Sequence, residues 1–593
     1  MSRLKLVLSV LFAVALAQLL LLLAFTMLVY EVTPKSTLAQ ATFIGRMQPV
    51  LLGVRLADRS LNFLYRGSEP SEPLPLYQLQ VKQEDLLKLE EETAKAEVFI
   101  ADDAKFWIDA TFTAEGEDYD VKIRIRGDRF NHWKFRKKSW RIKFPKEHLF
   151  HGMKEMTLII PEDRAWFAEM LNSYRARAMG LLQPPMQFTT VSINGSAPLV
   201  YLETEHWTKE MLEKQGRPGD INFYKTGGVN TSSFDGWDPI FKDIAYWDKF
   251  TTSVVSAHDS FEELDLLFSV MQPGAHTQPD FRERIRTIFD LDVLTKWYAH
   301  SLLAGNLHVG GDNLRLLFDS SRGRFEPIPW DVFLVEPRSL FTLPGNPLWN
   351  EVFAVPEWRL AVHKFLWDYV TNEKQVEQDL AETTRLRSLV ERAAYRDPLK
   401  LPSNRQVKND LDTRSAQVRA NLDFLHNELN TSVVSVTQRV PNSVMQAKGV
   451  SVVLDIVVSG PMPAVLSGVS IPLSVTVSSD IELYRDTGDG VFGASDTALS
   501  HTLERGKLSD TLHVSSYSEP LFPEQPPTDA SGEPLEIPRT LYRFFLVGLP
   551  VIAQSELPIS LDIRNVVSGS SATILRTTVV NDRANEERIP SLP

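Results

Sequence analysis

Apolar and polar residues alternate along several short stretches of the first half of the chain. Tyr77–Val81 and Ser139–Phe144 each place an apolar residue at every second position, which predicts two strands. In the second stretch Arg141 and Lys143 share the face opposite the apolar residues. Between these strands, the leucine spacing of Gln83–Ala96 predicts a charged helix. Strands and helices mixed in this way predict an α+β domain.

Further helices and a hairpin follow along the chain. Ala165–Met179 has a helical pattern and ends at a glycine, and Phe281–Leu303 and Val407–Leu429 are longer apolar-periodic stretches. The favoured turn pair Asn194-Gly195 separates two strand-like runs, which predicts a hairpin. We therefore expect one large domain over residues 76–430.

The composition changes near residue 432, where Ser, Thr, Val and Pro become frequent in short alternating runs. The expected strands are Val452–Val458, Ile471–Val477, Thr511–Ser515, Leu541–Val547 and Ile559–Ile563. Several short strands at this spacing predict an all-β sandwich over residues 431–593. Residues 518–538 are rich in proline and acidic side chains and are expected to form an exposed loop.

The N-terminus contains a long apolar stretch. Leu6–Tyr30 has no charged residue, and 25 helical residues at about 1.5 Å each exceed the hydrocarbon core of a bilayer. Arg3 and Lys5 precede it, so the positive-inside rule predicts a single-pass anchor in the cytoplasmic membrane with the remaining chain in the periplasm or outside the cell. The alternative is a signal peptide cleaved after Ala17. With the anchor retained, residues 31–75 would be a stalk that separates the first domain from the membrane.

Composition and charge narrow the functional classes. The chain has 593 residues, of which 43% are hydrophobic and 23% charged, as in ordinary globular proteins. Its formal net charge of -13 is opposite to that of a typical nucleic-acid binder. Cysteine is absent, which excludes thiolate metal sites, cysteine nucleophiles and disulfides.

The densest charged segment is Lys122–Lys146, which holds eleven basic residues and one acidic residue, Asp128. Lysine and arginine on strands beside a loop suit the binding of phosphate oxygens. The alternative is a solvated basic face paired with the carboxylates of this acidic protein.

Two later segments contain oxygen ligands at the ends of predicted strands. Gly305–Asn313 precedes a strand at Leu314–Phe318, and Pro329-Trp330-Asp331 follows a strand at Phe325–Ile328. An asparagine and an aspartate at neighbouring strand ends are hard ligands that can share Mg²⁺ with nucleotide phosphates. The alternative is local capping of a turn.

The order of these features resembles the CotH kinase family, whose members are secreted or surface proteins with an atypical protein-kinase-like fold. Six matches in the family's order carry the resemblance: Asp120–Gly127, Lys137–Phe144, Asp163 with Gly180, Tyr201–Glu205, Gly305–Asn313 and Pro329–Asp331. The resemblance covers about residues 76–429. It implies an atypical kinase domain, followed here by the β-sandwich and preceded by the transmembrane helix.

The resemblance implies roles for individual residues. Lys138 would contact the phosphates of ATP, with Arg141 and Lys143 on the supporting strand. Glu205 would orient a lysine. The remaining predicted ligands, for Mg²⁺, are Asn313 and Asp331.

The catalytic position departs from the family pattern. Family members commonly have an aspartate five residues before the loop asparagine, where kinases place the catalytic base. Here that residue is His308, and the nearby Asp312 has a different spacing. The enzyme hypothesis is a Ser/Thr kinase with a non-standard catalytic loop acting on envelope or secreted proteins. The alternative is a scaffold that binds a protein or polysaccharide.

A second candidate metal site lies in the C-terminal domain. Asp486, Asp489 and Asp496 are closely spaced around Gly490, which suggests a calcium loop. The spacing does not fit an EF-hand. The alternative is an acidic β-turn.

Overall fold

The structure of the protein is a computed structural model. It describes residues 12–21, 58–70, 72–96, 100, 104–219, 221–226, 240–241, 243–251, 260–272, 274–306, 313–337, 347–472, 481–514, 520–523, 541–549 and 559–581. The chain divides into two compact units, each built from separate segments. Unit 1 comprises Met1–Ser173, Pro184–Gly219 and Ala381–Ala416, and unit 2 comprises Tyr174–Gln183, Asp220–Leu380 and Gln417–Pro593.

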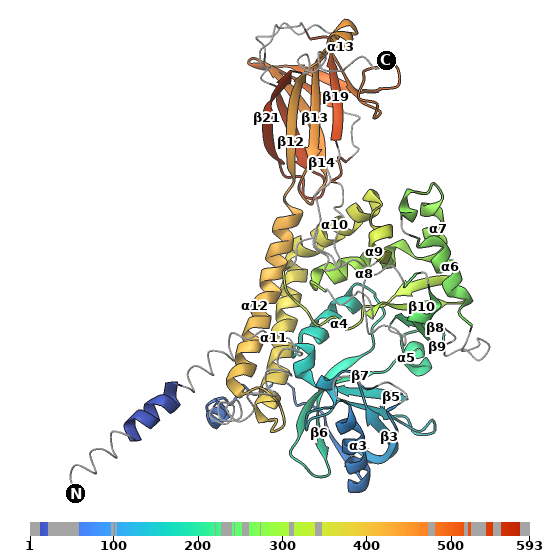
Figure 1. Ribbon diagram of the computed structural model, residues 1–593, viewed down its shortest axis with the longest axis vertical. Helices are drawn as coiled ribbons and strands as arrows, with labels where there is room; N and C mark the ends of the chain where they lie inside the picture. Colours follow the sequence, from blue (N-terminus) through green and yellow to red (C-terminus); the bar gives the residue numbers. More distant parts are fainter. Residues whose placement is uncertain are drawn as a thin grey trace. The chain divides into compact units, whose positions relative to one another are not determined.

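Unit 1 contains a closed β-barrel, drawn in blue and cyan in Figure 1. Around the barrel the strands follow the order β1 (Leu76–Val81), β2 (Ile108–Ala114), β3 (Glu117–Ile125), β4 (Trp140–Lys143), β5 (Glu155–Ile159), β7 (Leu199–Glu205) and β6 (Met186–Ile193). All neighbouring pairs are antiparallel except β1 and β6, whose parallel pairing closes the barrel.

Alternation along the strands explains the barrel. In β4 the tryptophan and isoleucine are buried while Arg141 and Lys143 lie on the outer face, as predicted. The interior is lined by apolar and aromatic side chains from every strand, among them Leu79, Phe112, Ile123, Ile142, Met156, Leu158, Val191 and Tyr201. The predicted hairpin between β6 and β7 is confirmed, and Asn194 and Gly195 have the positive φ angles (49° and 72°) that its tight turn needs.

A buried ion pair fixes the barrel to a distant part of unit 1. The Lys137 ammonium lies 2.8 Å from a carboxylate oxygen of Asp397, and neither side chain is more than 2% exposed. The same carboxylate accepts a hydrogen bond from the Val200 N–H of β7 (3.1 Å). The described end of the predicted stalk is also attached to unit 1, since Asp58 pairs with Arg405 (3.1 Å).

Helices account for the rest of the large predicted domain. They are α3 (Gln83–Lys95), α4 (Ala168–Ala178), α5 (Lys209–Lys214), α6 (Glu262–Val270), α7 (Phe281–Ile288), α8 (Leu291–Leu303), α9 (Pro347–Val352), α10 (Pro356–Thr371), α11 (Glu373–Arg396) and α12 (Asn404–Leu429). The prediction of one helical stretch over Phe281–Leu303 needs correction. Phe289 is extended, and the Asp290 side chain caps a new helix by accepting from the Asp292 N–H, so α7 and α8 are separate.

Unit 2 contains a small antiparallel sheet. Its strand order is β11 (Arg324–Pro327), β10 (Arg315–Asp319), β8 (Asn222–Thr226) and β9 (Trp247–Thr251). Buried aromatic residues hold α7 and α8 near this sheet, since the Phe289 and Phe325 rings lie 5.9 Å apart. The predicted strands at Leu314–Phe318 and Phe325–Ile328 match β10 and β11 to within one residue.

The C-terminal residues of unit 2 form two sheets, drawn in orange to dark red in Figure 1. The first has the order β16 (Thr497–Leu499), β15 (Glu482–Arg485), β19 (Leu541–Val547), β13 (Val450–Val458), β12 (Val433–Val440) and β21 (Thr573–Asn581). The second has the order β17 (His501–Arg505), β18 (Ser509–Val514), β14 (Ala464–Pro472) and β20 (Ser560–Asn565). Residues of both sheets share one apolar core.

Two predicted segments of this region differ from the structure or lie partly outside it. The strand expected at Ile471–Val477 begins earlier, because β14 covers Ala464–Pro472 and pairs with β18 and β20. Of the predicted loop at 518–538, residues 520–523 are described, and Leu521 forms a β-bridge with Ala464. The remainder of that loop lies outside the described residues.

The predicted membrane anchor lies mostly outside the described residues. Within Leu6–Tyr30 the structure describes residues 12–21, which are helical and exposed. No helix in the described part of the chain is both long and apolar enough to cross a membrane.

Candidate nucleotide and metal sites

The two predicted magnesium ligands flank one hairpin of unit 2. Asn313 precedes β10 and Asp331 follows β11, and these strands pair antiparallel. Beyond the last strand pair, the Ile328 N–H donates to the Arg315 carbonyl oxygen (3.0 Å). The Arg315 guanidinium also lies 5.3 Å from the centre of the Trp330 ring. Asn313 and Asp331 therefore leave the same end of the hairpin.

The backbone at this end of the hairpin is unusual. Asp331 has a φ of 57°, a left-handed conformation that few non-glycine residues adopt and that is enriched at functional sites. Gly305, at the start of the other predicted loop, has a φ of 60°. A Cβ atom at that position would lie 2.1 Å from the Glu336 carbonyl oxygen, so glycine is required for this close approach. Gly305, at the start of the first predicted loop, therefore lies against Glu336, five residues after Asp331.

The predicted catalytic residues cannot be placed in this way. His308 and Asp312 lie outside the described residues. Their assignment remains a prediction from the sequence.

Lys138 is buried in unit 1, where its own loop surrounds it. Its ammonium group donates to the carbonyl oxygens of Trp133 (2.9 Å) and Phe135 (3.2 Å). Burial lowers the pKa of Lys138, and the Glu90 carboxylate at 3.9 Å acts in the opposite direction. In this arrangement two of the three ammonium protons bind backbone carbonyls, so Lys138 stabilises the loop.

Arg141 and Lys143 lie on the outer face of the barrel. The Arg141 Nε and Nη2 atoms lie 2.7 and 2.6 Å from one carboxylate oxygen of Glu155 on β5. The Lys143 ammonium lies 4.0 Å from the other oxygen of Glu155. The structure therefore brings these two predicted phosphate ligands together around an internal carboxylate, and away from the interior face.

Glu205 forms an ion pair with Lys214. The Glu205 side chain is 1% exposed at the end of β7, and its carboxylate lies 2.8 Å from the Lys214 ammonium on α5. Burial raises the pKa of Glu205, and the hydrogen bond and charge of Lys214 counteract part of that increase. The Lys214 ammonium also donates to the His151 carbonyl oxygen (3.2 Å).

The sequence analysis missed Lys214, and it also missed a buried glutamine. The Gln183 side-chain amide donates to the Pro329 carbonyl oxygen (2.5 Å) and holds the segment before Asp331 in place. The contact of Gln183 has no local sequence signal, because Pro329 is far away along the chain. For Lys214 the sequence offered one hint, its position on the helix directly after the Glu205 strand.

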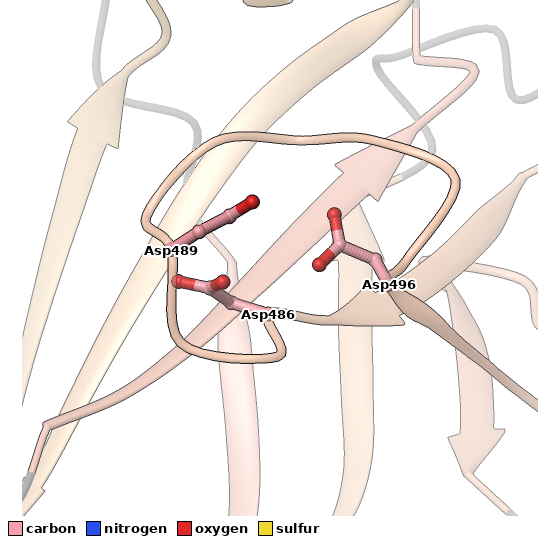
Figure 2. A group of neighbouring side chains, drawn as sticks. All are labelled: Asp486, Asp489 and Asp496. Atoms are coloured by element: carbon pink, nitrogen blue, oxygen red, sulfur yellow. The ribbon is translucent and has the colours of Figure 1, made fainter.

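The acidic loop of the C-terminal region brings its three aspartates together. Ligand oxygens of Asp486, Asp489 and Asp496 all lie within 4.8 Å of one another, and Figure 2 shows the three side chains gathered on one loop. Backbone N–H groups hold all three: Gly488 donates to Asp486 (2.8 Å), Val491 to Asp489 (2.9 Å) and Gly493 to Asp496 (2.9 Å). The carboxylates thus converge without a cationic side chain among these bonds.

These features describe a mixed α/β protein with a β-barrel unit and two candidate metal sites. Comparison with protein families identifies the family to which the chain belongs. The family described as CotH kinase protein matches residues 123–448, which is more than half of the chain. The chain therefore belongs to the CotH kinase protein family.

Two individual proteins are similar to parts of the chain. The inner spore coat protein H of Bacillus subtilis (strain 168) is 28% identical over 263 residues, which cover 44% of this chain and 68% of that protein. The crystal structure of the Helicobacter pylori proinflammatory kinase CtkA is 11% identical and covers 49% of this chain and 94% of its own, with a TM-score of 0.22. With a TM-score this low, the second likeness does not bear on the function of this chain.

Proposed function

We propose that this CotH family protein binds ATP together with Mg²⁺, and that Asn313 and Asp331 hold the metal. The observation that carries the proposal is the position of these two residues at one end of the β10–β11 hairpin. Their amide and carboxylate oxygens are suitable Mg²⁺ ligands. Mg²⁺ is commonly bound through one or two carboxylates together with substrate phosphates, and a set of one Asp and one Asn fits that pattern.

The proposal includes a reaction and a location. Asn313 and Asp331 would hold the Mg²⁺, and the charge of the ion would neutralise part of the negative charge of the ATP phosphates. His308 would accept the proton of a Ser or Thr hydroxyl on an envelope or secreted protein, because a neutral imidazole is a proton acceptor. The hydroxyl oxygen would form a bond to the γ-phosphorus of ATP as the bond from that phosphorus to the β–γ bridging oxygen breaks, and ADP would leave. The sequence pattern of Leu6–Tyr30 supports an extracytoplasmic location. The large domain and the expected C-terminal β-sandwich follow this apolar stretch along the chain.

The test is a nucleotide titration of the purified full chain with and without Mg²⁺. Asp331→Ala should abolish the Mg²⁺-dependent part of ATP binding, which isothermal calorimetry measures directly. Asp248→Ala is the matched control, because Asp248 is also an acid of this part of unit 2 and forms an ion pair with the half-exposed Lys225 (3.1 Å). The control should bind ATP as the parent protein does.

A second measurement separates binding from transfer. If His308 is the base, the parent protein should autophosphorylate with labelled ATP and His308→Ala should not. If only His308→Asp autophosphorylates, the chain binds nucleotide without being an active kinase. Failure of every variant and of the parent to bind ATP would refute the proposal and favour the scaffold alternative, in which the chain binds an envelope protein or a polysaccharide.

A separate proposal concerns Ca²⁺ at Asp486, Asp489 and Asp496. The convergence of their oxygens within 4.8 Å supports it. A ligand that binds only the native state raises stability by mass action, by about 2.7 kcal/mol at one hundred times its Kd. The C-terminal unfolding transition of the full chain should therefore move to higher temperature with Ca²⁺, and Asp489→Asn should remove that change. An unchanged unfolding temperature at millimolar Ca²⁺ would refute the Ca²⁺ site and favour the alternative, an acidic β-turn.

A further inference from the structure

A short turn within the predicted stalk presents apolar side chains to solvent. The turn ends in a 3₁₀ helix, η1 (Asn62–Leu64). The exposed fractions of Leu61, Phe63 and Leu64 are 48%, 69% and 63%. Single exposed apolar residues are normal on a protein surface, whereas a contiguous apolar patch marks a surface that contacts another molecule or a membrane.

A fourth exposed apolar residue adjoins these three. Leu401 is 42% exposed and lies in the connection between α11 and α12. The Arg59 guanidinium donates to the Leu401 carbonyl oxygen (3.0 Å), and the Asn404 N–H donates to the Asn62 side-chain oxygen (2.8 Å). These bonds place residue 401 beside the turn. We call Leu61, Phe63, Leu64 and Leu401 together the apolar patch.

Polar contacts fix the turn that carries the apolar patch to unit 1. Asp58 pairs with Arg405 on α12 (3.1 Å), and the Asn404 side-chain amide donates to the Asn62 carbonyl oxygen (3.1 Å). Keeping the apolar side chains of a fixed turn in water forgoes the stability that their burial would provide. Binding to another surface therefore explains the exposed side chains better than a role in the fold of unit 1.

The sequence before the apolar patch indicates which surface this is. The apolar stretch Leu6–Tyr30 precedes the patch, and thirty residues separate Tyr30 from Leu61. A chain of thirty residues reaches at most roughly 100 Å, whatever its conformation. An anchor at Leu6–Tyr30 would therefore confine the apolar patch to the neighbourhood of the membrane that holds the anchor.

The charge of this part of the chain suits a lipid surface with anionic headgroups. Residues 32–66 contain five basic residues and one acidic residue, in a chain whose formal net charge is -13. Basic residues close to a membrane are attracted to anionic lipids. The acidic residue is Asp58, and the basic residues are Lys35, Arg46, Arg55, Arg59 and Arg66.

We propose that the apolar patch inserts into the interface of a bilayer that contains anionic lipids, and so docks unit 1 on the membrane. A weak membrane-binding element needs a second signal for stable attachment. Here the anchor at Leu6–Tyr30 is the first signal, and the connecting chain makes binding of the apolar patch effectively intramolecular. The inference rests on the proposed anchor and location. It adds that the end of the predicted stalk is a contact site and not a spacer.

The test uses the full chain reconstituted into vesicles of phosphatidylcholine and phosphatidylglycerol, with or without bromine on the acyl chains. The chain has no cysteine, so Ser60→Cys carries a single bimane dye next to Leu61 and leaves the apolar patch intact. Bromine quenches at short range, so the emission of the dye should fall by about half in brominated vesicles when the patch is inserted. The control is a dye on Leu87→Cys, a 52%-exposed position on α3 of unit 1, which should keep its emission.

A pair of double variants tests the apolar side chains themselves. In the labelled Ser60→Cys chain, Leu61→Ser/Leu64→Ser should remove most of the quenching. The matched control is Leu266→Ser/Leu508→Ser, which changes two leucines of unit 2 that are 45% and 89% exposed and should leave the quenching unchanged. All four leucines are exposed, so we expect both double variants to fold.

Flotation of the vesicles separates failure of the anchor from failure of docking. A chain that does not float with the vesicles would refute the proposed anchor and the docking with it. If the chain floats, the docking proposal is overturned by a dye at Ser60→Cys that is unquenched or quenched no more than the dye at Leu87→Cys. Quenching that survives Leu61→Ser/Leu64→Ser would also overturn it. An unquenched dye is the result expected if the apolar patch binds a protein partner instead.

Discussion

Two buried carboxylates, one in each unit, respond to burial in opposite ways. Glu203 on β7 of the barrel has neutral partners, accepting hydrogen bonds from Tyr77 (2.9 Å) and Gln187 (3.1 Å), and burial raises its pKa despite these bonds. Asp455 on β13 would also have its pKa raised by burial. Hydrogen bonds from Arg543 and Arg439 lower the pKa of Asp455 below its usual range instead.

This difference shows that the charge of its hydrogen-bond partners determines whether a buried carboxylate stabilises or destabilises the fold. The Asp455 carboxylate accepts from two nitrogen atoms of Arg543 at 2.7 and 3.0 Å, so its charge is compensated at close range. The hydrogen bonds that Glu203 accepts from Tyr77 and Gln187 come from neutral groups. We therefore expect a charged Asp455 to stabilise the C-terminal sheets and a charged Glu203 to destabilise the barrel.

The largest expected effect comes from removing Asp455. Asp455→Ala leaves Arg543 and Arg439 partly buried without their carboxylate, and breaking such a pair costs about 3 kcal/mol or more. Amide hydrogen exchange of peptides from β13 should become faster by the matching factor, while peptides from the barrel should not change.

Asp562→Ala is the control for this variant, because Asp562 is 44% exposed and pairs with Arg564 at the surface (3.1 Å). Surface pairs of this kind contribute about 0–1 kcal/mol. Equal exchange rates in the two variants would mean that the arginines do not compensate Asp455.

A smaller effect of opposite sign is expected in the barrel. Glu203→Gln keeps the shape and the hydrogen-bonding capacity of the side chain but removes the buried charge. At pH 7 it should raise the free energy of unfolding of the barrel by roughly 1 kcal/mol, the scale of one altered hydrogen bond. Amide hydrogen exchange of peptides from the barrel strands measures this, because the tryptophans lie in both units and their fluorescence would not report the barrel alone.

The pH dependence distinguishes this explanation from a change in packing. Because the folded-state pKa of Glu203 is raised, its contribution is fully favourable below the unfolded value of about 4.3 and is lost as the pH rises towards the folded value. The gain from Glu203→Gln should therefore shrink as the pH falls towards 4.3. A gain that is constant with pH would argue against the charge. The 53%-exposed Glu213→Gln should show little gain at any pH.

Much of the strand arrangement could be predicted because it follows from local alternation and turn chemistry. The Asn194-Gly195 hairpin and the two faces of β4 are examples. Closure of the barrel could not be predicted, because the pairing of β1 with β6 joins stretches more than a hundred residues apart and both have ordinary strand patterns. The break between α7 and α8 was missed because Asp290 fits a helix surface as well as a cap.

The candidate sites were also predictable to different degrees, depending on whether their contacts follow from local sequence patterns. Asn313 and Asp331 could be brought together from the sequence, since a hairpin of short strands places its two ends side by side. Lys138 was different: its sequence neighbourhood is basic, and only the structure shows the backbone carbonyls of Trp133 and Phe135 around its ammonium group. Whether a charge faces a ligand or its own backbone depends on contacts that a sequence pattern does not record.

The closure of the barrel by β1 and β6 has a consequence for the order of events during synthesis. Residues 76–79 pair with residues 190–193, so the edge of β1 has no barrel partner on that side until more than a hundred further residues have been made. The ion pair between Lys137 and Asp397 forms later still, because Asp397 is 260 residues further along the chain. Contacts that are so distant in sequence form slowly, and an exposed strand edge is a site for aggregation. A nascent chain released between residues 205 and 397 would therefore contain all seven barrel strands and Glu162, 3.4 Å from the Lys137 ammonium, but would lack Asp397, the nearer of these two carboxylates.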